Sequence, residues 1–341
     1  MDRANVRPTM RDVAKLAGVS IKTVSRVVND EPAVSDALKA KVLTAAAQLG
    51  YRPNFTASTL RRSSNTTRTI GLLQQNVANP FSAALLRAIE DVARQRDVMV
   101  ISASVDEDDD RERRLSQAFL ARNVDGLIIV PTAGNHSYLA REVDRGTPVV
   151  FVDRAPAGID ADTVSSENIV GSRLALEHLI ASGHRRIAYI GDHRRISTAS
   201  ERLLGYREAL AAGGLASSPE LVITGVHSED IAERVVRSLL LSRRPPTALF
   251  TAQNLITIGA VRALRGLDLH HKIALFGYDD FLLSDLLDPQ VAVVEQDIYR
   301  LGQTAATLLF DRQEGRRTGP GEHIRIPTRL IVRSSGDLPP T

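Results

Sequence analysis

Short apolar runs recur along residues 69–294, and stretches with helical spacing, such as 83–95, separate them. The runs are 70–73, 98–101, 127–130, 149–152, 187–190, 221–223, 248–251, 273–276 and 291–294. Runs of this kind are typical of strands buried on both faces of a parallel sheet. The alternation predicts a doubly wound α/β body. Because about nine or ten strands exceed one comfortable open sheet, we expect two similar lobes.

Residues 9–29 have the spacing of two short helices joined by a tight turn. Thr9 can cap the first helix with Asp12 as its reciprocal partner, Gly18 ends that helix, and Ser20 is placed to cap the second. The apolar faces consist of Val13, Leu16 and Ala17 in the first helix and of Val24, Val27 and Val28 in the second. The pattern predicts a helix-turn-helix.

The second helix presents a polar face made of Lys22, Thr23, Ser25, Arg26 and Asn29. Arg and Asn can bond to base edges in the DNA major groove, and Lys neutralises phosphates. A solvated helical hairpin is the alternative interpretation. Charge favours DNA, because residues 1–66 carry 11 Lys and Arg against 5 Asp and Glu, whereas the remaining 275 residues carry 32 against 35.

A third helix begins at Ser35 and ends at Gly50. Its apolar positions are Leu38, Val42, Leu43, Ala46 and Leu49. Residues 51–54 break the helical pattern, and a short basic segment, 55–62, precedes a polar run. We interpret this region as a linker.

These motifs resemble the LacI/GalR family of bacterial transcription regulators along nearly the whole chain. The matching pieces are Asp12-Val13-Ala14, Gly18-Val19-Ser20, Thr23-Val24-Ser25-Arg26-Val27 and Gly50-Tyr51-Arg52-Pro53-Asn54. The resemblance implies that the second helix lies in the major groove and that the linker forms a hinge helix whose Leu60 wedges into a minor-groove step. Extra contacts on bent DNA can offset the cost of unstacking that step. Alternatively, Leu60 packs on the next domain.

The predicted domains are a helix-turn-helix head, 1–52, a hinge and linker, 53–67, an N-lobe, 68–166 with 297–325, and a C-lobe, 167–296 with 326–338. The resemblance implies that the lobes form a core similar to periplasmic binding proteins. The predicted DNA contacts are Thr9, Ser20, Ile21, Lys22, Thr23, Ser25, Arg26, Asn29, Tyr51, Asn54, Ala57, Leu60 and Arg61.

Polar residues follow most of the predicted strands. Examples are Asn76, Asn79, Ser104, Thr132, Asp153, Arg154, Gln253, Asn254, Asp279, Asp280, Gln296 and Asp297. Ligands of doubly wound sheets bind beyond the carboxyl ends of strands, and carboxylates, amides and a guanidinium suit the hydroxyls of a sugar. Many such residues are ordinary turn or cap residues, however. Their convergence points to a small polar ligand.

The family resemblance adds Phe81, Arg202 and His227 and places the ligand between the lobes. The predicted effector contacts are Asn79, Phe81, Thr132, Asp153, Arg154, Arg202, His227, Gln253, Asn254, Asp279 and Gln296. Many family members have Asn-Asp where this chain has Gln253 and Asn254, and an aromatic ring where it has His227. These departures extend the expected effectors from sugars and polyols to sugar acids and sugar phosphates.

Other features exclude several classes of protein. The chain has no cysteine and no apolar run long enough for a membrane span, and its N-terminus lacks the pattern of a signal peptide. The acidic run 106–110 is interpreted as preceding a helix over 111–121, whose positive end favours acids, and His270–His271 as a surface pair, so no metal or cofactor is predicted. Because no catalytic motif occurs either, we predict a non-enzymatic protein.

The predicted protein is a cytoplasmic, homodimeric repressor that binds a pseudo-palindromic operator in double-stranded DNA. An effector between the lobes would change the spacing of the two hinges and release the DNA, although co-repression is left open. The C-terminal residues have no heptad pattern, which favours a dimer over a tetramer. The alternative is a sugar-binding carrier or receptor without a transcriptional role, or a sugar-converting enzyme.

Overall fold

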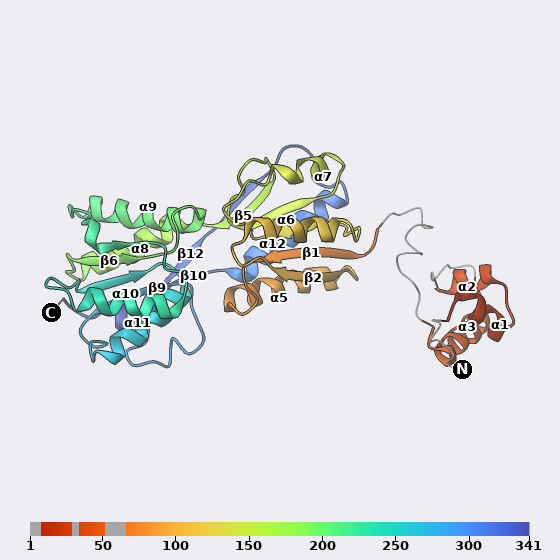
Figure 1. Ribbon diagram of the computed structural model, residues 1–341, viewed down its shortest axis with the longest axis horizontal. Coiled ribbons are helices and arrows are strands. Elements are labelled where there is room, and N and C mark those ends of the chain that lie inside the picture. The colour runs from red at the N-terminus through yellow and green to blue at the C-terminus, as the bar shows by residue number, and fades with distance from the viewer. Residues whose placement is uncertain (1–7, 29–33, 52–65, 341) are drawn as a thin grey trace. The chain divides into compact units, whose positions relative to one another are not determined.

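The computed structural model describes residues 8–28, 34–51 and 66–340. The chain divides into a head, residues 1–67, and a core, residues 68–341, which are described separately (Figure 1). In the described part of the chain, no helix combines the length and apolar character needed to cross a membrane.

The head contains the predicted helices, α1 (Met10–Ala17), α2 (Ile21–Val28) and α3 (Asp36–Leu49). Asp12 accepts hydrogen bonds from the backbone N–H and the hydroxyl of Thr9, at 2.8 and 2.7 Å. Gly18 ends α1 in the left-handed conformation, φ +60°, which suits glycine. Ser20 Oγ accepts a hydrogen bond of 3.0 Å from the Thr23 N–H. The predicted helix-turn-helix caps are therefore confirmed.

The three helices of the head share one small apolar core. Its fully buried side chains are Val13, Val24 and Val42, with Ala14, Ala17, Val27 and Ala45 around them. Leu16 and Leu43 do not belong to this core, contrary to the sequence prediction, because they expose 50% and 54% of their surface. The buried positions are 13, 14 and 17 in α1 and 42 and 45 in α3. Leu16 and Leu43 lie beside these positions, at the edge of the core.

The core contains two six-stranded sheets. The first, in the N-lobe, is parallel throughout and has the strand order β11-β5-β4-β3-β1-β2. Its strands are β1 (Thr69–Gln74), β2 (Met99–Ser104), β3 (Leu127–Ile129), β4 (Val149–Asp153), β5 (Asp162–Ser166) and β11 (His323–Ile326). The helices assigned to it are α5 (Pro80–Arg94), α6 (Asp109–Leu120), α7 (Ala140–Asp144) and α12 (Ile298–Gln313).

The second sheet, in the C-lobe, has the order β12-β10-β9-β8-β6-β7, and only the edge strand β12 pairs antiparallel. Its strands are β6 (Ile187–Ile190), β7 (Val222–Ile223), β8 (Ala248–Thr251), β9 (Ala274–Tyr278), β10 (Ala292–Gln296) and β12 (Thr328–Ile331). The helices are α8 (Asn168–Ala181), α9 (Ser197–Ala212), α10 (Glu229–Leu240) and α11 (Asn254–Gly266).

Helices cover both faces of each sheet (Figure 1). Successive side chains of a strand point to opposite faces, so each lobe has two apolar layers. In β6, Ile187 and Tyr189 pack toward α8 and α9, whereas Ala188 and Ile190 pack toward α10 and α11. The predicted fold class, a helical head with a two-lobed α/β core, is confirmed.

Three short segments connect the lobes. They follow β5, β10 and β11, at residues 166–168, 296–298 and 326–328. Strands β5, β11 and β12 were not predicted from the apolar runs. Their sequences, such as Asp-Thr-Val-Ser-Ser in β5, contain polar residues that hydrogen-bond where the lobes are joined.

Candidate functional site

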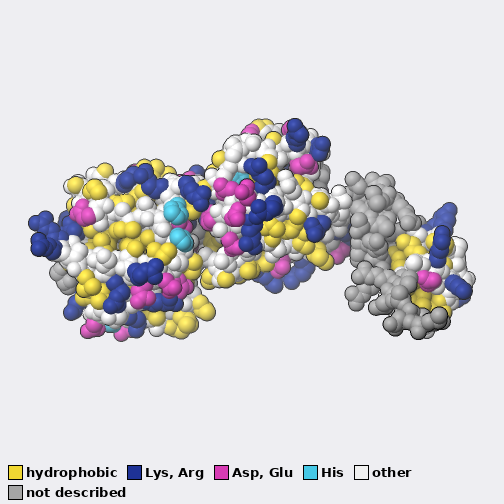
Figure 2. All heavy atoms as spheres, viewed as in Figure 1, with side chains coloured by type: hydrophobic (Ala, Val, Ile, Leu, Met, Phe, Trp, Pro, Cys, Tyr) yellow, Lys and Arg dark blue, Asp and Glu magenta, His cyan; other side chains and the backbone are white. Residues whose placement is uncertain are grey.

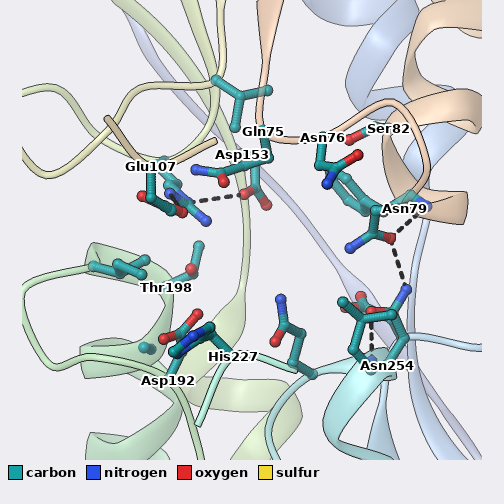
Figure 3. A pocket seen from close by; sticks show the side chains of 18 of the residues that line it. Gln75, Asn76, Asn79, Ser82, Glu107, Asp153, Asp192, Thr198, His227 and Asn254 are labelled. Atoms are coloured by element: carbon teal, nitrogen blue, oxygen red, sulfur yellow. Dashed lines mark hydrogen bonds and ion pairs between the residues drawn. The ribbon is translucent and has the colours of Figure 1, made fainter. Parts of the chain in front are cut away.

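A cleft of about 650 Å³ lies between the lobes, at the carboxyl ends of their strands (Figure 3). Its walls include most of the residues predicted as effector contacts. These are Asn79, Phe81, Asp153, Arg154, Arg202, His227, Gln253, Asn254, Asp279 and Gln296. They come from both lobes, so a ligand in the cleft would touch both. The structure thus brings together ten of the eleven predicted residues.

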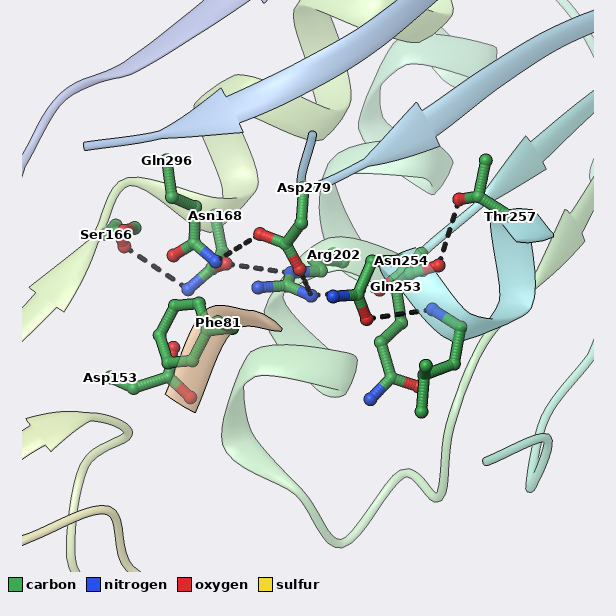
Figure 4. A network of polar contacts seen from close by, with 12 residues as sticks. Phe81, Asp153, Ser166, Asn168, Arg202, Gln253, Asn254, Thr257, Asp279 and Gln296 are labelled. Atoms are coloured by element: carbon green, nitrogen blue, oxygen red, sulfur yellow. Dashed lines mark hydrogen bonds and ion pairs between the residues drawn. The ribbon is translucent and has the colours of Figure 1, made fainter. Parts of the chain in front are cut away.

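Arg202, on α9, is held rigidly at the C-lobe wall (Figure 4). Its Nε donates a hydrogen bond of 2.9 Å to Asn168 Oδ1, and its Nη1 donates one of 2.9 Å to the Ala252 carbonyl oxygen. The guanidinium carbon lies 3.7 Å from the centre of the Tyr278 ring. These contacts fix a buried positive charge at the cleft.

Asp279 lies next to that guanidinium, with Oδ2 3.9 Å from Arg202 Nη1. Gln296 Nε2 donates a hydrogen bond of 2.5 Å to Asp279 Oδ1. Burial raises the pKa of Asp279, and the Arg202 charge and the Gln296 hydrogen bond oppose this. Desolvation acts to lower the pKa of Arg202, but the neighbouring Asp279 and other groups raise it overall. Asp279 and Arg202 therefore place a hydrogen-bond acceptor beside a donor at the cleft wall.

Asp153, the last residue of β4, is the corresponding carboxylate on the N-lobe. Its Oδ2 lies 3.4 Å from Arg154 Nε, and Arg154 Nη1 donates a hydrogen bond of 2.7 Å to Glu107 Oε1. Burial raises the pKa of Asp153, and the Arg154 charge opposes this. Asp153 and Asp279 both have positive φ angles, +71° and +67°, and so turn the chain at equivalent strand ends.

Two buried amides leave oxygen atoms without partners. Among the residues that the structure describes, Gln253 Oε1 and Gln296 Oε1 accept no hydrogen bond from the protein. Both side chains line the cleft. An unpaired buried acceptor costs about 1–3 kcal/mol of stability. A hydroxyl or amine group of a bound ligand that donates a hydrogen bond to either oxygen would remove this cost.

Thr132 was predicted as an effector contact, but it does not line the cleft. Its backbone N–H donates a hydrogen bond of 2.7 Å to the buried carboxylate of Glu112, and its side chain is 4% exposed. Glu112 also accepts a hydrogen bond of 2.9 Å from Tyr138 and lies 3.1 Å from His136 Nε2. This network holds the Thr132 backbone against Glu112 in the N-lobe, whereas Val130, two residues earlier, lines the cleft.

Other polar strand-end residues have structural partners, as expected for ordinary turn residues. Ser104 Oγ accepts from the Val77 N–H, Asp280 pairs with Arg333, and Asp297 caps α12. The acidic run also behaves as predicted, because Asp108 caps α6.

Several lining residues were missed by the sequence prediction. They are Gln75, Ser82, Glu107, Asp192, His193, Arg195, Thr198 and Glu229. Gln75, Asp192 and His193 closely follow β1 and β6, so the strand-end rule already contained the signal that would find them. Glu107 has the same signal, because it follows the end of β2 by three residues, and it lies next to Arg154 in the cleft.

In the head, the predicted DNA contacts that the structure describes are on or near α1 and α2, except Tyr51, which follows α3. Thr9, Ser20, Ile21 and Lys22 are exposed, and Thr23, Ser25 and Arg26 are half-buried. Tyr51 packs against the core of the head. The predicted contacts Asn29, Asn54, Ala57, Leu60 and Arg61 lie outside the described residues. Ile21, 44% exposed, offers an apolar surface beside Lys22.

Family models match both parts of the chain. Residues 9–54 match bacterial regulatory proteins of the lacI family, and residues 176–336 match a periplasmic binding protein-like domain. Among solved structures, a lac repressor dimer bound to operator and the anti-inducer ONPF is 28% identical, with a TM-score of 0.83 over 97% of this chain and 99% of that one. A CelR–cellobiose complex is 33% identical, with a TM-score of 0.72 over 96% and 100%.

Curated relatives match over nearly the same length. The transcriptional regulator GalR of Escherichia coli K12 is 32% identical and covers 97% of this chain and 96% of its own length. The ribose operon repressor of the same strain is 34% identical and covers 89% and 92%. From the head motif, the two-lobed core and these similarities, we conclude that the chain belongs to the lacI family of bacterial regulatory proteins.

Proposed function

We propose that this chain is a transcriptional repressor whose head binds operator DNA and whose cleft binds a small sugar-like effector that controls DNA affinity. The observation that carries the proposal is the presence of a helix-turn-helix head and a polar two-lobed cleft in one chain. A carrier or receptor would need the cleft but not the head. The similar lac repressor structure, which contains operator, supports the proposed binding of DNA by the head. The CelR–cellobiose complex supports the proposed binding of an effector in the cleft.

The effector is a neutral sugar or polyol. Six acidic residues line the cleft, Asp106, Glu107, Asp153, Asp192, Glu229 and Asp279, against three arginines, Arg154, Arg195 and Arg202. A sugar acid or sugar phosphate would add negative charge to walls on which acidic side chains already outnumber arginines. Hydroxyl groups both donate and accept, so they suit the carboxylates and the unpaired amide oxygens. The charge of the cleft therefore favours a neutral sugar or polyol over a sugar acid or sugar phosphate.

The repressor acts as a homodimer on a pseudo-palindromic operator. Leu282, Leu283 and Leu286 expose 83%, 53% and 74% of their surface on the segment after β9. Clustered exposed leucines mark interaction surfaces. We assign this surface to a second copy of the chain, because the similar lac repressor structure is a dimer.

Effector binding releases the DNA by changing the angle between the lobes. A shift of the lobes would move the attached hinge segments, in which Leu60 is the proposed minor-groove wedge. Coupling of this kind is usually worth about 1–3 kcal/mol. The protein works in the cytoplasm without catalytic turnover, which agrees with the regulatory names of its relatives.

A thermal-shift screen against neutral sugars, polyols, sugar acids and sugar phosphates tests the effector half, because a cleft ligand raises stability by mass action. We expect a neutral compound to raise the melting temperature of the native protein but not of an Asp279→Asn variant, which has a weaker acceptor. The same compound should then lower affinity for an operator chosen by selection from random DNA. Stabilisation without an effect on DNA binding would contradict the regulatory proposal, and failure to select any DNA sequence would contradict the repressor assignment.

A further inference from the structure

Three potential metal ligands come together on the C-lobe wall of the cleft. Asp192 and His193 follow β6, and His227 precedes α10. One ligand atom from each side chain lies within 4.8 Å of the other two. The two imidazole rings are nearly parallel, with centres 5.8 Å apart. Figure 3 shows Asp192 beside His227, and Figure 2 shows exposed histidine side chains on the C-lobe near the junction of the lobes.

The backbone holds the two loops together. The Gly191 N–H donates to the Ile223 carbonyl oxygen at 3.0 Å, and the Val226 N–H donates to the Gly191 carbonyl oxygen at 3.0 Å. Gly225 has a φ of +81°, and a Cβ atom there would lie 3.2 Å from the His193 ring. Glycine therefore both permits this turn and leaves room for the imidazole. The approach of the two histidines results from paired backbone segments.

The donor types suit a transition metal. We propose that Asp192, His193 and His227 bind a divalent transition-metal ion such as Zn²⁺ at the wall of the cleft. Imidazole nitrogens select zinc, nickel, cobalt or copper over calcium and magnesium, which prefer oxygen donors. Three protein ligands are the usual number at a zinc site that keeps one position for water or another oxygen ligand.

The surroundings of His227 support a ligand role. Its Nδ1 lies 3.3 Å from the Gly225 carbonyl oxygen. When Nδ1 carries the proton and donates it to that carbonyl, Nε2 is left with its lone pair, which is the usual arrangement of a metal-bound histidine. A cation is also favoured by the excess of acidic residues along the cleft. Glu229, the nearest other acidic residue in sequence, pairs with Arg262 at 2.5 Å, and among the described residues Asp192, His193 and His227 are the three whose ligand atoms come together.

Calorimetric titration of the untagged, chelator-treated full-length protein with Zn²⁺ tests the site without any effector or DNA. We expect one Zn²⁺ per chain, and we expect His193→Ala and His227→Ala each to weaken binding by at least about tenfold. Co²⁺ should give visible absorption bands in the native protein that both variants lose. Because both histidines are exposed, the variants should melt at the same temperature as the metal-free native protein.

The matched control is His271→Ala, which removes an exposed histidine of the same lobe, one near Asp288 rather than in the cleft. This variant should bind Zn²⁺ as the native protein does. The proposal is overturned if the native protein binds no Zn²⁺ up to millimolar concentration, or if His193→Ala and His227→Ala bind it as tightly as His271→Ala does. Since the titration needs neither sugar nor operator, its failure would leave the proposed repressor function intact.

Discussion

The side-chain amide of Asn254 donates a hydrogen bond of 2.9 Å to Asn79 Oδ1, joining the C-lobe to the N-lobe across the cleft wall. Asn79 Oδ1 also accepts from the Phe81 N–H at 3.0 Å, so the same oxygen caps α5 and contacts the opposite lobe. The two residues lie 175 positions apart. Their contact holds the cleft in the conformation that the structure shows.

Asn254→Ala should therefore loosen the lobes in the absence of ligand. A hydrogen bond of this kind is worth about 0.5–1.5 kcal/mol, and urea unfolding should show a loss of this size. The control is Asn79→Asp, which keeps the acceptor for both donors and should retain most of the stability. Because Asn79→Asp keeps both the cap of α5 and the contact between the lobes, equal losses in the two variants would show that the loss in Asn254→Ala does not come from this contact.

The cleft illustrates what the sequence can predict. Asp153, Gln253 and Asp279 were found because parallel strands bring their carboxyl ends to one edge of a sheet, so position along the chain is enough to place them. The contact between Asn79 and Asn254 could not be predicted in this way. It depends on how far the two lobes close, and no local pattern records that distance.

The errors have physical causes too. Thr132 follows a strand, as the rule requires, but the buried Glu112 holds its backbone away from the cleft. The burial of Glu112 depends on partners at least 20 residues away in the sequence, Thr132 and Tyr138. The approach of His193 to His227 was missed because it depends on the backbone hydrogen bonds of Gly191 with Ile223 and Val226, which join residues more than 30 positions apart.

Asp153→Asn should stabilise the ligand-free protein at neutral pH. Because burial raises the pKa of Asp153 above its ordinary value of 3.8, the folded protein keeps this proton at pH values where the unfolded chain has lost it. The stability that Asp153 contributes is thus complete below about pH 3.8 and is lost as the pH rises through the raised value. The uncharged asparagine side chain has no charge to desolvate, and asparagine tolerates the positive φ angle at this position. Arg154 keeps Glu107 as a partner.

The measurement is the difference in the free energy of unfolding between Asp153→Asn and the native protein from pH 4 to pH 7. We expect the difference to favour the variant and to grow with pH. Effector affinity should fall about 10–100-fold in the same variant, because a hydrogen bond to a charged group is worth about 1.5–3 kcal/mol. A variant less stable than the native protein at pH 7 would mean that the pairing of Asp153 outweighs its desolvation.

Leu282→Asp should weaken self-association. A charge placed on an apolar contact between two copies must be desolvated in the dimer, which costs several kcal/mol and should raise the dimer dissociation constant by about 100-fold or more. Analytical ultracentrifugation measures this change. Leu241→Asp is the control, since Leu241 is 70% exposed at the end of α10 and lies in another part of the C-lobe sequence. If both variants remain dimeric, the dimer contact lies elsewhere.

Arg26→Ala and Lys22→Ala should affect DNA binding in different ways. Arg26, in the last turn of α2, can read a base edge, so its loss should cost about 1–3 kcal/mol on the selected operator and relax preference at one position. Lys22, exposed in the first turn, is placed for a phosphate. Its loss should weaken binding to every sequence and reduce the slope of log affinity against log salt by about 1. Fluorescence anisotropy with operator and scrambled duplexes at several salt concentrations separates the two effects, and identical behaviour of the two variants would refute this division of roles along α2.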